Sequence, residues 1–150
     1  MSCNKVPEDS FKDNGDGTVT DTRTGVIWLK NANSCPNKFW HDAMAYCSNL
    51  QSGDAGLTDG SVAGDWRLPS KEELQGIGTD PPATWEIGRP FVWTMPGEPF
   101  TDVQSDAYWS GTTEVLHADV AWLVGMKDGQ VGGTYKSTAA LCVWPVRAGN

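Results

Sequence analysis

The sequence predicts an α+β domain in which two helices pack on twisted antiparallel sheets, with one long irregular loop. Three observations lead to this fold class. Two segments with helical periodicity lie among segments whose apolar residues follow strand patterns. Residues 79–106 show no period, and eight tryptophans and seventeen glycines indicate an aromatic core joined by many turns. At 150 residues we expect one domain over 11–147, with an extension at 1–10 and a tail at 148–150.

The first β region covers residues 11–29. Within it, "TVTD" at 18–21 alternates in the manner of a strand. "VIWL" at 26–29 is a continuous apolar run, which is typical of a strand buried on both faces. The stretch "DNGDG" at 13–17 allows two interpretations, a calcium-binding loop or the turn of a hairpin.

The positions of the oxygen ligands favour the turn. An EF-hand loop needs an oxygen ligand at its first position, glycine at its sixth and a bidentate glutamate at its twelfth. With Gly17 at the sixth position, the first is Lys12 and the twelfth is Arg23, and both are cations. We therefore predict a tight turn whose side chains bond the local backbone. No cofactor is expected, and a structural calcium ion at an irregular site remains the alternative.

Residues 37–51 predict the first helix. Their apolar residues recur at steps of three and four, which places them in one stripe on a helix. Asn37 is the expected N-cap, and Ser52 with Gly53 is expected to end the helix. The stripe consists of Trp40, Ala43, Met44, Cys47 and Leu50.

A second, shorter helix is predicted after Pro69. Ser70 and Glu73 form the S-x-x-E capping box that marks a helix start. This box gives Glu72 and Glu73 a structural role at the helix N-terminus, where negative charge is favoured. We therefore do not interpret them as a catalytic carboxylate pair.

The last third of the chain is strand-like. The patterns at 107–112, 119–126, 130–135 and 139–148 predict strands. Asp128-Gly129 between two of these runs is the strongest hairpin signal in the chain. The loop 79–106 that precedes them carries several aromatic residues, so we expect it to be packed rather than disordered.

Charge and hydropathy exclude two classes of protein. The net charge is -8, whereas nucleic-acid binding draws its affinity from lysine and arginine. No apolar run approaches the roughly 20 residues of a membrane helix. The first ten residues, "MSCNKVPEDS", lack the apolar region of a signal peptide, and we expect a leader to have been removed.

The cysteines Cys3, Cys35, Cys47 and Cys142 are widely spaced, without the close pairs that zinc sites use. An even number fits two disulfides in an oxidising compartment. Two alternatives stay open: buried free thiols in a cytoplasmic protein, and Cys3 as a lipid-anchor site.

Five ordered motifs resemble one family, the bacterial surface domain named for the C-terminal domain of the Legionella collagen-like adhesin. They are "FKDNGDGTVTDTRTGVIWL", "WHDAMAYC", "DWRLPSKEEL", "YWSGTT" and "VWPVR", within residues 11–147. The resemblance implies a C-type-lectin-like fold and an extracellular or cell-envelope location. It also implies recognition of glycans or host surfaces.

Most residues in these motifs are structural if the resemblance holds. It implies a disulfide between Cys47 and Cys142, which would join the first helix to the last strand, and pairing of Cys3 with Cys35. The expected core residues are Trp28, Trp40, Trp66, Leu68, Trp109 and Trp144.

The chain departs from the calcium-dependent sugar lectins. Those lectins chelate calcium and sugar hydroxyls through Glu-Pro-Asn or Gln-Pro-Asp followed by Trp-Asn-Asp, whereas this loop has Glu98-Pro99-Phe100. Phenylalanine supplies no oxygen ligand. We therefore expect neither a calcium-bridged sugar site nor a metal site.

The catalytic motifs GxSxG and HExxH are absent from the sequence, so we expect a binding domain and not an enzyme. A glycan could stack on aromatic residues of the loop and the last hairpin. Alternatively, 113–138 could be a variable protein-binding display of the kind that diversity-generating retroelements use, or the chain could be a structural subunit of an envelope assembly. A homo-oligomer also stays open. The predicted ligand-binding residues are Trp85, Trp93, Glu114, His117, Asp119, Tyr135 and Lys136.

Overall fold

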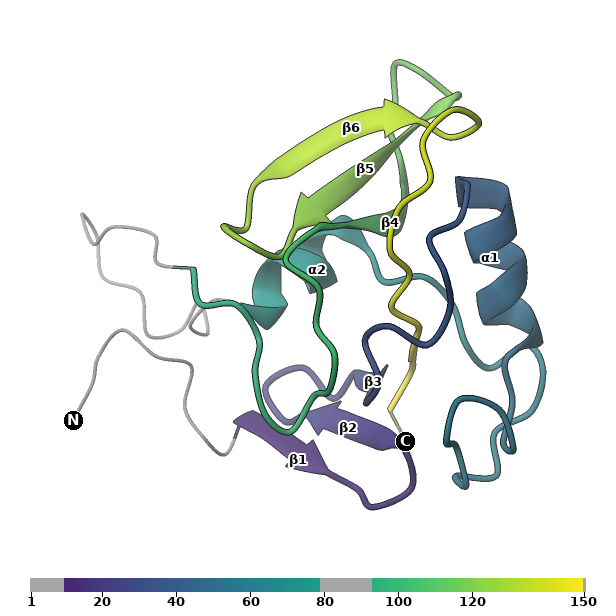
Figure 1. Cartoon of the computed structure of the whole chain (residues 1–150), viewed down its shortest axis with the longest axis vertical. Coiled ribbons are helices and arrows are strands. Elements are labelled where there is room, and N and C mark those ends of the chain that lie inside the picture. The colour runs from purple at the N-terminus through teal and green to yellow at the C-terminus, as the bar shows by residue number, and fades with distance from the viewer. Residues whose placement is uncertain (1–9, 79–92, 150) are drawn as a thin grey trace.

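The computed structural model describes residues 10–78 and 93–149, which form an α+β fold of two antiparallel sheets and two helices. Figure 1 shows the two sheets at opposite ends of the molecule, with α1 along one side. One sheet has the order β1 (Phe11–Asp13), β2 (Thr18–Asp21), β3 (Ile27–Leu29), β7 (Val146–Arg147). The other has the order β4 (Ala107–Thr113), β5 (Val120–Gly125), β6 (Val131–Tyr135).

The hairpin predicted at the start of the chain is confirmed. Strands β1 and β2 pair antiparallel, and aspartates hold the turn between them. Asp13 Oδ1 accepts the Gly15 N–H at 2.9 Å, and Asp16 Oδ1 accepts the Thr18 N–H at 3.1 Å. These carboxylates satisfy turn amides, as short polar side chains do in Asx turns.

Helix α1 (Trp40–Asn49) begins two residues later than the predicted cap Asn37 would place it. Phe39 is the N-cap and makes no side-chain cap bond; the Lys136 carbonyl instead accepts the Trp40 N–H at 3.1 Å. The carbonyl of the residue that follows β6 therefore replaces the expected side-chain cap. Of the predicted stripe, Met44 is exposed, while the other four members are buried.

Helix α2 (Lys71–Ile77) confirms the capping box. Ser70 Oγ accepts the Glu73 N–H at 3.1 Å, and Glu73 Oε1 accepts the Ser70 N–H at 2.7 Å. Arg67 also binds both carboxylate oxygens of Glu73, at 2.7 and 2.9 Å. Glu73 is thus fully used by the fold, as its position predicts.

Two clusters of buried side chains form the core. All six residues predicted for the core are buried. The larger cluster is centred on Trp144, whose ring packs edge-on against Trp28 and Phe100 at centroid distances of 4.9 and 5.0 Å. The smaller cluster joins α1 to β4 through Trp40 and Trp109. Phe100, the residue that departs from the calcium-lectin pattern, is therefore a core residue.

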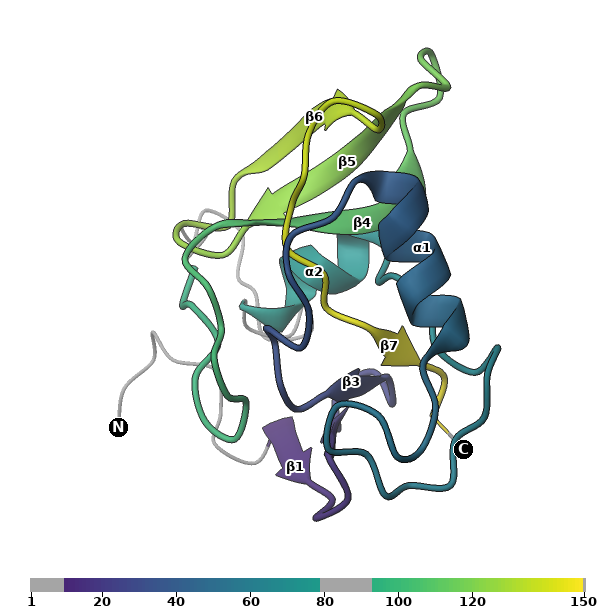
Figure 2. The same cartoon turned by 45° about the vertical axis from the view of Figure 1, so that its right-hand side comes forward.

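The hairpin predicted at Lys127–Gly129 is also confirmed, because β5 and β6 pair antiparallel across this turn. The strand predicted at 139–148 is much shorter than expected. Pro145 interrupts it, leaving β7 as two residues that pair with β3 (Figure 2). The preceding residues instead form isolated bridges, such as Lys38 with Leu141.

The predicted disulfide between Cys47 and Cys142 is not found. Cys35, Cys47 and Cys142 are free thiols in the structure, and Cys3 lies outside the described residues. Cys47 packs in the smaller cluster, whereas Cys142 belongs to the larger one and its thiol donates to Asn37 Oδ1 at 3.5 Å. Burial raises the pKa of the Cys142 thiol to about 11, so this thiol stays protonated and unreactive near neutral pH.

Candidate recognition surface

The turn between β4 and β5, residues 114–119, projects from one end of the molecule (Figure 2). Its backbone closes on itself: the Glu114 N–H donates to the Val120 carbonyl at 2.9 Å, and the His117 N–H donates to the Glu114 carbonyl at 3.1 Å. The Glu114 carboxylate adds two contacts. Its Oε2 accepts the Leu116 N–H at 3.0 Å and lies 2.8 Å from His117 Nδ1. One side chain thus fixes the shape of the turn.

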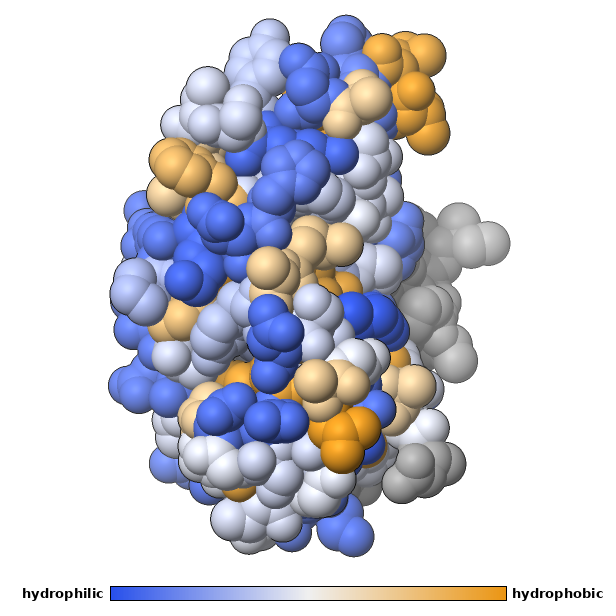
Figure 3. Space-filling model, turned by 90° about the vertical axis from the view of Figure 1, so that its right-hand side faces the viewer, coloured by the Kyte–Doolittle hydropathy of each residue, from blue (hydrophilic) through white to orange (hydrophobic). Residues whose placement is uncertain are grey.

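The tip of this turn presents aliphatic side chains to solvent. Val115 is 93% exposed and Leu116 is 81% exposed. Figure 3 shows strongly hydrophobic residues gathered at this end of the molecule. Single exposed apolar residues are ordinary on protein surfaces. Two adjacent ones on a hydrogen-bonded turn form a compact apolar projection that the fold does not cover.

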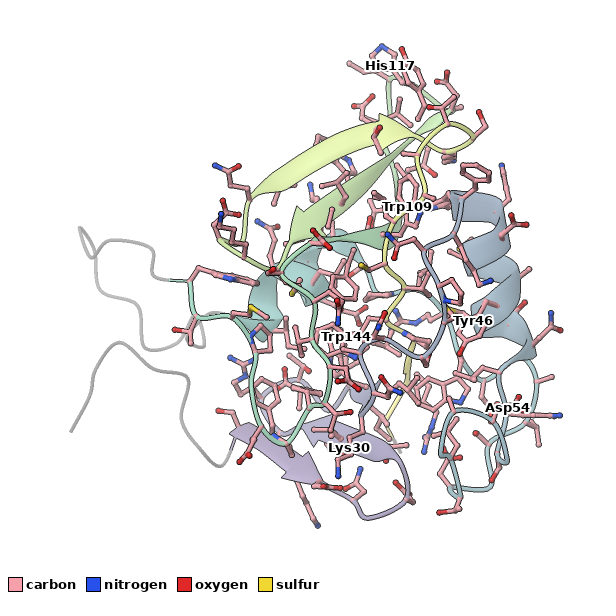
Figure 4. All side chains as sticks on the ribbon, in the orientation of Figure 1. Lys30, Tyr46, Asp54, Trp109, His117 and Trp144 are labelled. Carbon is pink, nitrogen blue, oxygen red and sulfur yellow. The ribbon has the colours of Figure 1, made fainter. Side chains whose placement is uncertain are left out.

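The predicted contact residues Glu114, His117 and Asp119 all lie in this turn. Glu114 has an internal role, since its carboxylate bonds the turn. The His117 side chain is 66% exposed, and Figure 4 shows His117 at the projecting end of the molecule. Tyr135 pairs with Val120 at the base of the turn and is 56% exposed. The structure thus brings five of the predicted residues together at one end, since Lys136, which follows Tyr135, also bonds this turn.

Lys136 supports the turn from inside. It is 9% exposed, and its Nζ donates to Thr113 Oγ1 at 2.9 Å and to the Ala118 carbonyl at 2.8 Å. The ammonium also lies 4.0 Å from the centroid of the Trp40 ring. Its bonds and burial leave Lys136 little capacity to bind a ligand, so its role is in the fold.

Trp93 is likewise a packing residue. Its Nε1 donates to the Met126 carbonyl at 2.9 Å. Glycines lie against its ring: a β-carbon on Gly78 would fall 2.6 Å from the ring, and one on Gly129 would fall 2.5 Å from it. The indole therefore joins the end of α2 to the β5–β6 turn. Trp85, the other predicted loop tryptophan, lies outside the described residues.

Sequence reasoning missed Val115 and Leu116, because adjacent apolar residues after a strand resemble its continuation. The available signal was their position between polar residues, Glu114 on one side and His117 on the other.

The described residues 10–78 and 93–149 contain no group of three His, Cys, Asp or Glu side chains that could hold a metal ion. In those same ranges, no helix is long and apolar enough to cross a membrane. The exposed side chains at the tip of the turn are the aliphatic Val115 and Leu116 and the imidazole of His117.

A comparison with known families assigns the chain. The profile described as the Lcl C-terminal domain matches residues 17–147. The chain belongs to the Lcl C-terminal domain family. This family is one of bacterial surface domains, which confirms the resemblance seen in the five motifs and fits an extracellular or cell-envelope location. A search of curated proteins gave no match.

Proposed function

We propose that this Lcl C-terminal domain is a non-enzymatic recognition domain that binds a protein on a host or envelope surface through the β4–β5 turn. The observation that carries the proposal is the exposure of Val115 and Leu116 on a turn held by Glu114. A rigid turn loses little conformational entropy on binding. Burying the two aliphatic side chains against a partner would favour binding, since the removal of apolar surface from water drives most protein association.

A protein partner fits this tip better than a glycan. Aliphatic side chains offer no hydrogen bonds to sugar hydroxyls, and Trp93 is occupied by its packing role. Tyr135 is the one predicted stacking residue that the structure shows exposed, which supports glycan binding beside the turn as a second candidate. The alternative of a variable protein-binding display at 113–138 also includes this turn.

We also propose that the domain has a C-type-lectin-like fold. A C-type-lectin-like arrangement is supported by the pairing of β7 with β3, which brings the first and last strands of the domain into one sheet. It is also supported by two helices and a second three-stranded sheet that carries the projecting turn. In such a scaffold, binding residues lie on loops held by regular elements.

The proposal is tested by replacing the tip. The double variant Val115→Ser/Leu116→Ser should lose capture of a surface protein from envelope or host-membrane extracts. The protein captured by the wild type is then purified, and its affinity for each variant is measured by biolayer interferometry. Loss of two buried aliphatic contacts should weaken binding at least about tenfold.

Val62→Ser is the matched control, because Val62 is also an exposed aliphatic residue, at 59%, in the separate loop 50–65. It should bind as the wild type does. Full affinity in the double variant would contradict the proposal. Loss of binding in Tyr135→Ala alone, with a glycan as the ligand, would favour the second candidate.

A further inference from the structure

Strand β6 is an outer strand of the β4–β5–β6 sheet, and Figures 1 and 2 both show it at the margin of that sheet. Successive residues of an antiparallel strand direct their backbone N–H and C=O groups alternately toward and away from the neighbouring strand. Directly before β6 the Gly125 N–H donates to the Gln130 carbonyl, and directly after it the Lys136 N–H donates to the Asp119 carbonyl, both at 2.8 Å. Even-numbered residues of β6 therefore bond β5, and odd-numbered residues direct these groups outward. The outward-facing residues are Val131, Gly133 and Tyr135.

These outward groups form an unprotected edge. Within residues 10–78 and 93–149, they make no hydrogen bond to another segment. The other outer strands differ: the outer side of β4 bonds Pro69 and Cys142, and that of β7 bonds Arg67. Strand β1 carries the exposed charges of Lys12 and Asp13. Proteins usually protect sheet edges by such cover or charge, or by proline, whereas β6 reads VGGTY and has neither charge nor proline.

The outward side of β6 is symmetric about Gly133. Val131 precedes this glycine by two residues and Tyr135 follows it by two, so their side chains share one face of the strand. Val131 is 37% exposed and Tyr135 is 56% exposed. When a second β6 pairs antiparallel with Gly133 opposite its copy, each Val131 falls opposite a Tyr135. Pairs of aromatic and β-branched residues stabilise neighbouring strands, and this register also pairs every outward N–H and C=O group.

We propose that two copies of this chain dimerise through antiparallel β6 strands, with the two-fold axis at Gly133. The two three-stranded sheets then become one continuous sheet. A second copy fits this edge better than an unrelated strand, because the two-fold register uses both exposed apolar residues of each copy. Strand β6 carries no charge, so this register brings no like charges into opposition along the paired strands.

The interface is the backbone edge of β6 and not the tip of the β4–β5 turn, so the inference does not rest on the proposed function. The turn projects near the Tyr135 end of β6. Since the paired strands run in opposite directions, the two projecting turns of the dimer lie at opposite ends of the joined sheet.

Sedimentation equilibrium tests the proposal from about 10 µM to about 1 mM protein, because a small interface gives weak association. The buffer contains about 0.15 M salt to screen the net charge of -8 on each copy. The wild type should show a reversible equilibrium between monomer and dimer. Val131→Lys/Tyr135→Lys places lysines opposite each other in the proposed register, whereas Val131→Lys/Tyr135→Glu places lysine opposite glutamate. The first variant should associate at least about tenfold more weakly than the second.

Amide hydrogen exchange of the wild type, followed by NMR, tests the edge residue by residue. The outward amides of Val131, Gly133 and Tyr135 should become protected as the protein concentration rises. The amides of Gly132 and Thr134 point toward β5 and should be protected at every concentration.

Val62→Lys is the control, because it adds the same charge at an exposed valine outside both sheets. It should dimerise as the wild type does, and so should Val115→Ser/Leu116→Ser, which separates this interface from the projecting turn. A wild type that stays monomeric at about 1 mM would overturn the proposal. So would equal association of the two charged double variants, a dimer in which the outward amides gain no protection, or loss of the dimer in Val115→Ser/Leu116→Ser.

Discussion

The two turns at 13–17 and 114–119 are stabilised in the same way and are placed differently. In each, carboxylates accept backbone N–H groups of the turn itself. The first turn is covered: the Thr58 N–H donates to the Asp16 carbonyl and the Lys30 N–H to the Gly17 carbonyl, both at 2.9 Å. The tip of the second turn carries aliphatic side chains in solvent. The hydrogen bonds within a turn therefore do not indicate whether it binds a ligand. The two turns differ in whether other segments of the domain cover the tip, and this difference distinguishes a structural turn from a candidate binding turn.

The largest effect is expected in the covered turn. Gly17 has a φ of +89°, and a β-carbon there would lie 2.6 Å from the Gly56 carbonyl oxygen. Gly17→Ala should lower the free energy of unfolding by about 2–4 kcal/mol, because strain and a backbone clash add together. Urea unfolding measures this change. Gly15→Ala is the control: φ is also positive, at +78°, but nothing lies within 4 Å, so about 1 kcal/mol is expected.

A smaller loss is expected beneath the exposed turn. Lys136→Met removes the buried ammonium and leaves the Ala118 carbonyl and the Thr113 hydroxyl without this donor. We expect a loss of about 2 kcal/mol in urea unfolding. Lys127→Met, at an exposed lysine of the β5–β6 turn, should stay within about 0.5 kcal/mol of wild type. Equal stability of the two variants would show that Lys136 does not support the turn.

Acid should destabilise the loop that covers the first turn. Asp59, in the loop that contains Thr58, has a fully covered side chain 3.1 Å from Arg147 Nη2. Burial raises the pKa of Asp59, but hydrogen bonds from Ser61 and the charge and hydrogen bond of Arg147 outweigh it, so the pKa lies below its ordinary value of 3.8. A lowered carboxyl pKa contributes stability above the unfolded value and loses it as the pH falls through the folded value.

The stability that Asp59 contributes should therefore be present at neutral pH and decline below about pH 4. Asp59→Asn should cost about 1–2 kcal/mol at pH 7, and less under acid conditions, as followed by urea unfolding at both pH values. An equal cost at both pH values would show that the charge of the Asp59 carboxylate does not stabilise the fold.

The smallest effect on stability is expected at the tip itself. Val115→Ser/Leu116→Ser should leave the free energy of unfolding within about 0.5 kcal/mol of wild type, because both side chains are already in water. Thermal and urea unfolding provide the measurement. A loss above about 1 kcal/mol would mean that the tip packs against the domain and is not a free surface.

Features set by short-range sequence were predictable. The capping box at Ser70–Glu73, the turn at 127–129 and the buried tryptophans follow from local spacing and hydropathy. Features that depend on contacts between distant segments were not. Lysine is normally a surface residue, so Lys136 gave no sign that a strand and a helix start would enclose it.

The candidate sites divide in the same way. The sequence predicted strands at 107–112 and 119–126, on either side of the exposed turn. It placed ligand contacts on Trp93, whose packing depends on glycines at 78 and 129. Periodicity identified the buried stripe of α1 and gave no information about what faces its polar side.

The pairing of β7 with β3 has a consequence for how the domain is made. The Trp144 indole N–H donates to the Leu29 carbonyl across 115 residues of chain, so the first sheet and the larger core close last during synthesis. Such non-local closure slows folding, because loop-closure entropy is lost before the contacts form. A nascent chain therefore remains unfolded while most of the domain is being translated. The last strand must leave the ribosome before the Trp144 ring can complete the larger core.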